Sequence, residues 1–306
     1  MSLSNPLPIA TVIITTRNRR DMLRRAVQSA VSQEGDIEVL VVDDASTDGT
    51  CEMLRQEFPT VRVEARTEQA GYIAQRNRAF RLARGPIVVT IDDDAVFSTS
   101  KIVQQAVGFF DNPRIGALAL AFANFFDGVG HPWYKDIPDV SSATYTFIGT
   151  ASAIRRELFL KVDGYREVYR HWTEEVDFCL KLLNQGYFVR FAPADLIHHF
   201  PDHTSRNSDN NKLVFRNRIL AIWFNAPAIM VVPLLTGTCA KSVFHGLRTG
   251  NLKTVVTGLV LGLVGIFRER EPRKPVSMVV YRAFSKLRRK MIPISELEKL
   301  IPVSVN

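Results

Sequence analysis

The chain has 306 residues, of which 46% are hydrophobic and 23% charged, ordinary values for a globular protein with a large core. Three scattered cysteines exclude a disulfide framework and a Cys-x-x-Cys zinc site. The charge is uneven: residues 1–240 hold 26 Lys and Arg against 27 Asp and Glu, whereas residues 241–306 hold 13 against 4, so no nucleic-acid partner is expected.

Short apolar runs alternate with helical patterns in the first 95 residues. Runs of strand length stand at residues 9–14, 37–42, 61–65 and 87–91. Apolar residues at helical spacing follow the first run, from Met22 to Val31, and a second helix is predicted over residues 71–83. The alternation predicts a doubly wound α/β sheet, in which ligands bind beyond the carboxyl ends of the strands.

Aspartates directly follow two of these predicted strands. Asp43 and Asp44 come after the second run, and Asp92, Asp93 and Asp94 come after the fourth. The chain has neither Gly-x-Gly-x-x-Gly nor a P-loop, so the phosphates of a bound nucleotide would need a partner such as a divalent cation held by carboxylates. A solvated acidic turn or a helix cap is the alternative explanation.

The second half contains two further polar clusters. Glu174, Glu175 and Asp177 begin a predicted helix, where acidic residues commonly only complement the helix dipole. A predicted strand over residues 187–191 is followed by His198 and His199, which we expect on a loop. Ligands to a metal and plain surface histidines are the two explanations of that pair.

Six segments resemble, in order and spacing, the motifs of family 2 glycosyltransferases. These segments are residues 11–19, 41–50, 74–79, 91–94, 162–167 and 173–182. The resemblance covers about residues 9–205 and implies the GT-A fold, an α/β fold with a Rossmann-like mixed sheet flanked by helices. It implies a catalytic domain of residues 1–205, with a nucleotide-sugar-binding half at 9–95 and an acceptor half at 96–205.

The resemblance places the donor site at the strand ends. Thr15 and Asp44 match residues that hold the nucleotide base and ribose, and Asp92 matches the first aspartate of the DxD motif, near the ribose. Asp94 matches the second, which binds a metal ion bridging the diphosphate, here Mn²⁺ or Mg²⁺.

Other donor-side candidates match the family less closely. His198 is the better match to a further metal ligand and His199 is the reserve, and a neutral imidazole fits Mn²⁺ better than Mg²⁺. Arg17 replaces a frequent tyrosine and either reaches a phosphate or base or covers the surface. Arg76 lies in the matching helix, and Asp93 is the variable middle residue, as well explained as a mere neighbour.

On the acceptor side, Glu175 falls where the family places its catalytic base, normally an aspartate. Glu174, one residue earlier, is the alternative base because the glutamate side chain is one methylene longer. Trp172 is a candidate to stack on a sugar face or else a core aromatic, and Asp177 in the same motif is a candidate substrate-binding residue. One such carboxylate is needed to deprotonate an acceptor hydroxyl.

Residues 206–306 do not resemble the catalytic domain and predict a helical, partly apolar and basic extension. A helix is expected over residues 211–225, and Pro227 and Pro233 should break the uncharged run 219–240. That run and a second one at 254–267 favour amphipathic helices over a transmembrane pair. The basic residues expected to face anionic headgroups are Arg282, Lys286, Arg288, Arg289 and Lys290.

Together these features predict an inverting, metal-dependent glycosyltransferase. It would move a hexosyl or deoxyhexosyl group from a nucleoside-diphosphate sugar to a hydroxyl of a glycan or lipid-linked acceptor, in cell-surface polysaccharide synthesis. Since residues 1–8 lack signal-peptide character, we expect it at the cytoplasmic face of a membrane. The alternatives are a catalytically inactive relic of the fold that binds a sugar or nucleotide or serves as a scaffold, and a nucleotidyltransferase, whose basic glycine-rich signature is missing from the first loop.

Overall fold

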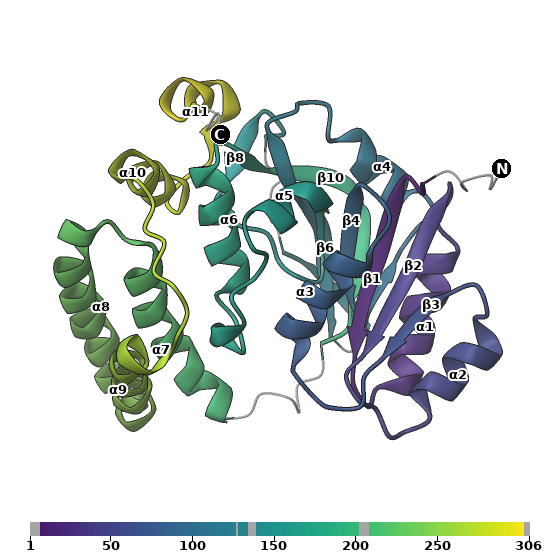
Figure 1. Ribbon diagram of the computed structural model, residues 1–306, viewed down its shortest axis with the longest axis horizontal. Helices are drawn as coiled ribbons and strands as arrows, with labels where there is room; N and C mark the ends of the chain where they lie inside the picture. Colours follow the sequence, from purple (N-terminus) through teal and green to yellow (C-terminus); the bar gives the residue numbers. More distant parts are fainter. Residues whose placement is uncertain (1–6, 127, 134–138, 202–207, 303–306) are drawn as a thin grey trace.

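A mixed β-sheet forms the centre of the protein, which we describe from a computed structural model covering residues 7–126, 128–133, 139–201 and 208–302 (Figure 1). Helices cover the sheet, and a helical C-terminal part stands beside it. The strands are β1 (Ala10–Thr16), β2 (Ile37–Asp43), β3 (Arg62–Ala65), β4 (Ile87–Asp92), β5 (Ala95–Phe97), β6 (Ile115–Phe126), β7 (Val129–Pro132), β8 (Ser142–Thr144), β9 (Ser152–Arg155), β10 (Phe188–His199) and β11 (Ile292–Pro293). The helices are α1 (Arg20–Val31), α2 (Thr50–Glu57), α3 (Tyr72–Leu82), α4 (Ile102–Gly108), α5 (Arg156–Lys161), α6 (Glu174–Asn184), α7 (Ser208–Asn225), α8 (Ala228–Thr249), α9 (Leu252–Arg268), α10 (Met278–Leu287) and α11 (Ile294–Leu300).

The sheet changes direction in its middle. Its strand order is β11-β8-β10-β6-β9-β4-β1-β2-β3, and β3, β2, β1 and β4 run parallel while β9 is antiparallel to both β4 and β6. The register of the parallel part sets Thr15 beside Asp92 and Thr16 beside Asp43. The predicted aspartates therefore lie together at the carboxyl ends of the parallel strands, and β4 is the neighbour of the antiparallel strand β9.

Alternate residues of the central strands feed two hydrophobic cores on opposite faces of the sheet. Val12 and Ile14 of β1 join the cluster that includes Leu23 of α1, whereas Ile13 joins the cluster that includes Phe80 of α3 and Phe178 of α6. Successive residues of a strand point to opposite faces of the sheet, and here both faces are buried. The predicted strands therefore consist of continuous β-branched runs. The predicted α/β fold with a mixed, helix-flanked sheet is confirmed.

Two local predictions are wrong. The histidine pair lies within β10 and not on a loop, because that strand resumes after an irregularity between Ala192 and Ile197 and pairs with β5 and β6. Pro233 does not end a helix but lies inside α8, whereas Pro227 precedes the first residue of α8, as expected. Since one proline removes a single backbone hydrogen bond, the packing of α8 on α7 and α9 can outweigh it.

The C-terminal part returns to the sheet. The predicted boundary at residue 205 lies outside the described residues, and α7, α8 and α9 pack together beyond it (Figure 1). After α10 the chain adds β11 to the edge strand β8, and Val276 and Leu297 join the core that contains β1. The described residues from Val276 to Ile301 thus pack against the sheet and its core.

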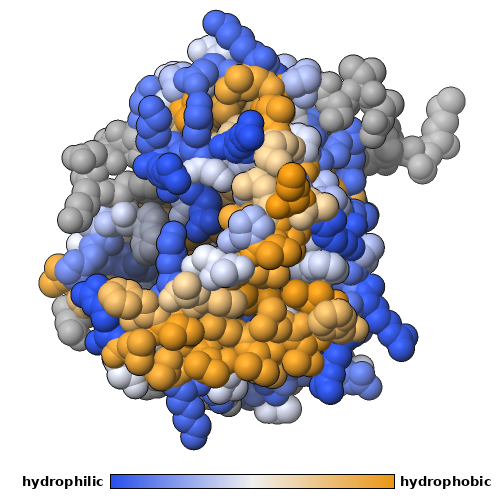
Figure 2. All heavy atoms as spheres, turned by 90° about the vertical axis from the view of Figure 1, so that its left-hand side faces the viewer, coloured by the Kyte–Doolittle hydropathy of each residue, from blue (hydrophilic) through white to orange (hydrophobic). Residues whose placement is uncertain are grey.

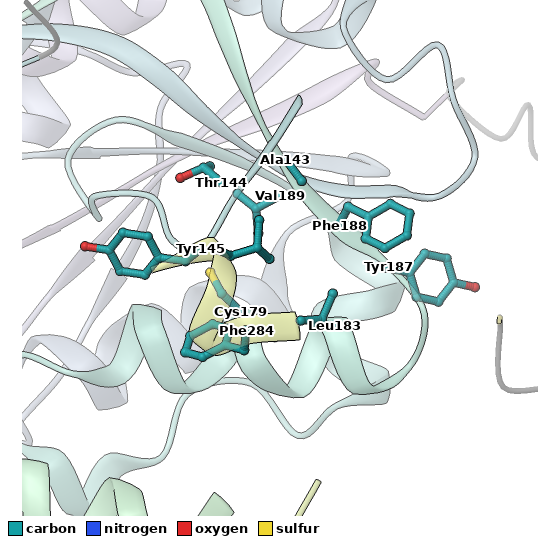
Figure 3. Close-up of a pocket in the computed structure, with 10 residues that line it drawn as sticks. Ala143, Thr144, Tyr145, Cys179, Leu183, Tyr187, Phe188, Val189 and Phe284 are labelled. Atoms are coloured by element: carbon teal, nitrogen blue, oxygen red, sulfur yellow. The ribbon is translucent and has the colours of Figure 1, made fainter. Parts of the chain in front are cut away.

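A small cavity lies where α10 packs against α6. Its volume is only about 10 Å³, and Figure 3 shows its lining, including Cys179 of α6, Phe284 of α10 and Val189 of β10. The hydroxyl groups of Tyr145 and Tyr187 point away from its middle (Figure 3). We therefore interpret it as a packing seam and not as a substrate site.

Candidate active site

Two aspartates and a histidine meet at the carboxyl edge of the sheet. Asp92 is the last residue of β4, Asp94 follows two residues later, and His199 ends β10; one ligand atom from each lies within 4.8 Å of the others. Asp94 is buried, and its Oδ1 atom accepts no hydrogen bond of good geometry from the described part of the chain, although it lies 3.2 Å from His199 Nε2. Two carboxylates and an imidazole around such an unpartnered oxygen fit a divalent cation such as Mn²⁺.

His199, the reserve candidate, points to this cluster, whereas His198, the better sequence match, does not. Nδ1 of His199 lies 2.7 Å from Asn124 Oδ1, which turns Nε2 toward Asp94. The His198 ring instead packs against Phe125, with ring centroids 4.4 Å apart and the ring planes tilted by 46°. Successive residues of a strand point to opposite faces, so only one of the two can face the aspartates. The choice of His198 is corrected to His199.

Asp93 faces inward and has its own partners. Its carboxylate accepts hydrogen bonds from Thr16 Oγ1 at 2.8 Å and from Arg19 at 2.9 Å, and Arg19 also binds Asp94 Oδ2 at 2.8 Å. Burial raises the pKa of Asp93 to about 6, although Arg19 opposes the shift. Asp93 therefore anchors the end of β4 and does not face a ligand, in keeping with the alternative of a mere neighbour.

Arg76 connects the aspartate cluster with the acidic end of α6. Its guanidinium is buried and lies 2.5 Å from Asp92 Oδ1, 3.8 Å from Glu174 and 3.9 Å from Glu175. A Cβ atom on Gly149 would clash with this guanidinium, so the glycine makes room for it. One cation thus separates the two acidic groups.

Glu174 and Glu175 have different surroundings although both begin α6. Glu174 is fully buried, accepts a hydrogen bond from the Tyr72 hydroxyl at 2.7 Å, and has its pKa raised to about 8 by burial and by the neighbouring carboxylate. The side chain of Glu175 is 18% exposed, and burial also raises its pKa while Arg76 opposes the shift. Because two adjacent carboxylates do not both ionise readily, burial and the neighbouring charge favour the protonated form of Glu174, and Glu175 is the carboxylate with access to solvent.

The segment before α6 has an unusual backbone. Arg170, Trp172 and Thr173 all have positive φ angles, between 60° and 83°, and the Trp172 side chain is exposed. Asn217 of α7 holds this segment by donating to the carbonyls of Tyr169, His171 and Trp172 at 2.7–3.1 Å. Such backbone strain persists where the surrounding structure fixes it, commonly at functional sites. Trp172 is thus held on the surface beside the glutamates, consistent with its predicted sugar contact.

The other residues predicted to bind the nucleotide differ in their exposure to solvent. Thr15 lies half-buried beside Asp92, and Arg17 is exposed. Asp44 is buried and accepts hydrogen bonds from the backbone of Ala70 and Gly71 and from Gln75, so it holds the loop before α3. Its predicted contact with the nucleotide stays a prediction.

Asp177 does not face the open site. Its carboxylate is buried, accepts hydrogen bonds from Tyr169 at 2.7 Å and Asn225 at 2.6 Å, and lies 3.3 Å from Arg166. It sits about one turn after Glu174 on α6, on the side that packs on α7. Its predicted role in binding substrate is therefore corrected to a structural one.

Sequence reasoning gave no role to several polar residues of the site. Arg19 ends the first motif and could have been suspected from its charge, which complements the aspartates of β4. Tyr72, Asn124 and Asn217 had no such signal, since each acts on residues at least 45 positions away.

Comparisons with known proteins agree with this geometry. The family model described as Glycosyl transferase family 2 matches residues 11–175. An uncharacterized glycosyltransferase of Haemophilus influenzae is 25% identical over 207 residues, which are 65% of this chain and 70% of that protein. The putative teichuronic acid biosynthesis glycosyltransferase TuaG of Bacillus subtilis is 32% identical over 147 residues, which are 47% of this chain and 58% of that protein.

A solved structure extends the likeness to nearly the whole chain. Mannosyltransferase PcManGT from Pyrobaculum calidifontis, in complex with GDP-Man and Mn²⁺, has a TM-score of 0.57 and 20% identity, with 97% of this chain and 88% of that chain covered. This likeness supports the GT-A fold, including the C-terminal helices. Since the family model matches more than half of the chain, the protein belongs to glycosyl transferase family 2.

Proposed function

We propose that this protein is a metal-dependent, inverting glycosyltransferase that uses a nucleoside-diphosphate sugar. The observation that carries the proposal is the pairing of the Asp92–Asp94–His199 cluster with the partly exposed carboxylate of Glu175, on either side of Arg76. A donor diphosphate at the cluster would leave its sugar on the side of Glu175.

The residues of the cluster suit the donor diphosphate. A divalent cation held by Asp92, Asp94 and His199 would neutralise the diphosphate and the charge that develops on it as a leaving group. Arg19 and Asn124 fix the directions of the Asp94 carboxylate and the His199 ring, so the ligand atoms need little reorganisation when the donor binds. The mannosyltransferase with a similar fold, described with GDP-Man and Mn²⁺, supports a nucleotide-sugar donor.

Glu175 serves as the base for the acceptor hydroxyl. The acceptor oxygen attacks the anomeric carbon from the face opposite the diphosphate, while its proton passes to Glu175 Oε. Arg76 keeps Glu175 ionised, and Trp172 offers an exposed aromatic face for a sugar ring. We propose that a hexosyl or deoxyhexosyl group passes from the donor to a hydroxyl of a glycan or lipid-linked acceptor in polysaccharide synthesis, a setting that the name of the Bacillus subtilis relative supports.

A thermal-shift screen of nucleoside diphosphates tests the donor part of this proposal. Each diphosphate is added with Mn²⁺ and, separately, with EDTA. At a ligand concentration 100 times the Kd, binding to the native state adds about 2.7 kcal/mol to the free energy of unfolding, a shift of several degrees. We expect one diphosphate to raise Tm with Mn²⁺ and not with EDTA. If no diphosphate raises Tm under either condition, the proposed nucleoside-diphosphate-sugar donor is wrong.

A further inference from the structure

Helices α8 and α9 turn their bulky apolar side chains toward solvent. In α9 five exposed apolar residues recur at helical spacing as one stripe: Val256, Val260, Leu263, Val264 and Phe267, with Phe267 89% exposed; Leu261 is also exposed. In α8 the corresponding exposed residues are Ile229, Val232, Phe244 and Leu247. We call the five residues of the stripe and these four residues of α8 the α8–α9 face. A helix of a globular protein normally buries such a stripe.

The opposite sides of the same helices are built from small residues. A Cβ atom on Gly258 would lie 2.5 Å from the Lys212 carbonyl oxygen, and one on Gly262 would lie 2.7 Å from Ile219 Cβ, so α9 packs closely on α7. In α8 the buried residues include Ser242 and Gly246. Small residues inside and large apolar residues outside are the arrangement of helices that face lipid.

The charged residues of α8 and α9 are all basic. From residue 210 to residue 268 the sequence has no Asp or Glu. Lys241, Arg248, Lys253 and Arg268 are exposed on the two helices, and Figure 2 shows a broad apolar band with hydrophilic side chains along its borders. A second copy docked on this face would bring like charges together, whereas anionic headgroups complement them.

We propose that the α8–α9 face docks on an anionic lipid bilayer, with both helices lying in the plane of the headgroup region. Among the described residues, α8 is the one helix long and apolar enough to cross a membrane, with 22 residues and a mean hydropathy of 1.3. Lys241 in the middle of α8 and the packing of its other side on α7 and α9 favour a flat orientation over a span. The docking does not depend on the transfer reaction, so it can fail or hold independently of the proposed function.

Co-sedimentation of the full chain with vesicles tests the docking. Vesicles of phosphatidylcholine alone are compared with vesicles in which about one third of the lipid is phosphatidylglycerol. The apolar variant Val260→Asn/Phe267→Ser leaves the net charge unchanged and should weaken binding about tenfold or more. The charge variant Arg248→Gln/Lys253→Gln should weaken binding to the anionic vesicles about 10- to 30-fold.

Matched variants elsewhere on the surface control for net charge and surface polarity. Arg55→Gln/Lys101→Gln makes the same change in net charge on α2 and beside α4, and Leu160→Asn replaces an exposed apolar residue on α5. Both should bind like the unaltered chain, and added salt should weaken binding. Equal binding to neutral and anionic vesicles, or loss of binding in the control variants, would overturn the proposal. So would a dimer in solution that Val260→Asn/Phe267→Ser dissociates, because the face would then be covered by a second copy.

Discussion

Replacing Glu175 by Gln should lower turnover about 10²–10⁴-fold, the usual contribution of a positioned general base. The amide keeps the shape of the side chain at the start of α6 but cannot accept the proton of the acceptor hydroxyl. Donor binding should stay close to that of the unaltered enzyme, because Glu175 lies across Arg76 from the aspartate cluster. Steady-state turnover and calorimetric titration of the donor nucleotide measure the two effects separately.

Glu174→Gln is the matched control for this substitution. Burial favours the protonated, uncharged form of the Glu174 side chain, so a neutral amide can replace it, still accept the hydrogen bond from Tyr72, and change turnover little. If Glu175→Gln keeps normal turnover and Glu174→Gln is inactive, then Glu174 and not Glu175 is the base.

The same pair of variants separates pH effects on activity and stability. Since the pKa of Glu175 is raised above the ordinary 4.5, turnover should fall on the acid side at a higher pH than for a free glutamate. The pKa of Glu174 is about 8 in the folded chain and about 4.5 when unfolded, so stability falls as pH rises through this window. Glu174→Gln should remove that decline, which is at most about 1.4 kcal/mol per pH unit. Denaturant unfolding at several pH values measures it.

Replacing a residue of the aspartate–histidine cluster should abolish metal-dependent nucleotide binding. Loss of groups that only orient metal ligands commonly costs 10- to 100-fold in affinity, so Asp94→Asn should cost at least about 100-fold. His199→Gln should weaken Mn²⁺-dependent binding of a nucleoside diphosphate similarly, as measured by calorimetry with Mn²⁺ and with EDTA.

His198→Gln is the control for the metal experiment. Its ring packs against Phe125 and points away from the cluster, so Mn²⁺-dependent binding should be unchanged. If His198→Gln removes this binding and His199→Gln does not, the assignment from the structure is wrong and the original sequence match is right.

Much of the fold could be predicted from the sequence because its signals are local. The β-branched runs that become β1, β2 and β4 are buried on both faces, so their composition alone marks them as strands. The helices α1 and α3 follow from apolar spacing. The return of α10 and β11 to the sheet had no such signal, because β11 has only two residues and pairs with β8, nearly 150 positions earlier.

The site could be predicted in part. Asp92, Asp94, Arg76 and Glu175 lie together because the strand ends and the start of α6 meet at one edge of the sheet. The choice between the two histidines depended on whether β10 continues past Pro193, since one residue of register turns the ring to the other face. The burial of Asp177 could not be predicted, because its hydrogen-bond partners come from distant parts of the chain, above all Asn225 of α7.

The configuration of the newly formed glycosidic bond tests the central claim most directly. In a single displacement the acceptor oxygen, deprotonated by Glu175, approaches opposite the departing diphosphate, so the anomeric configuration must change. Proton NMR of the product, recorded as it forms from an α-linked donor, should show a β-linked sugar. A product that retains the configuration of the donor would require a covalent intermediate or a front-side attack and would contradict the role assigned to Glu175.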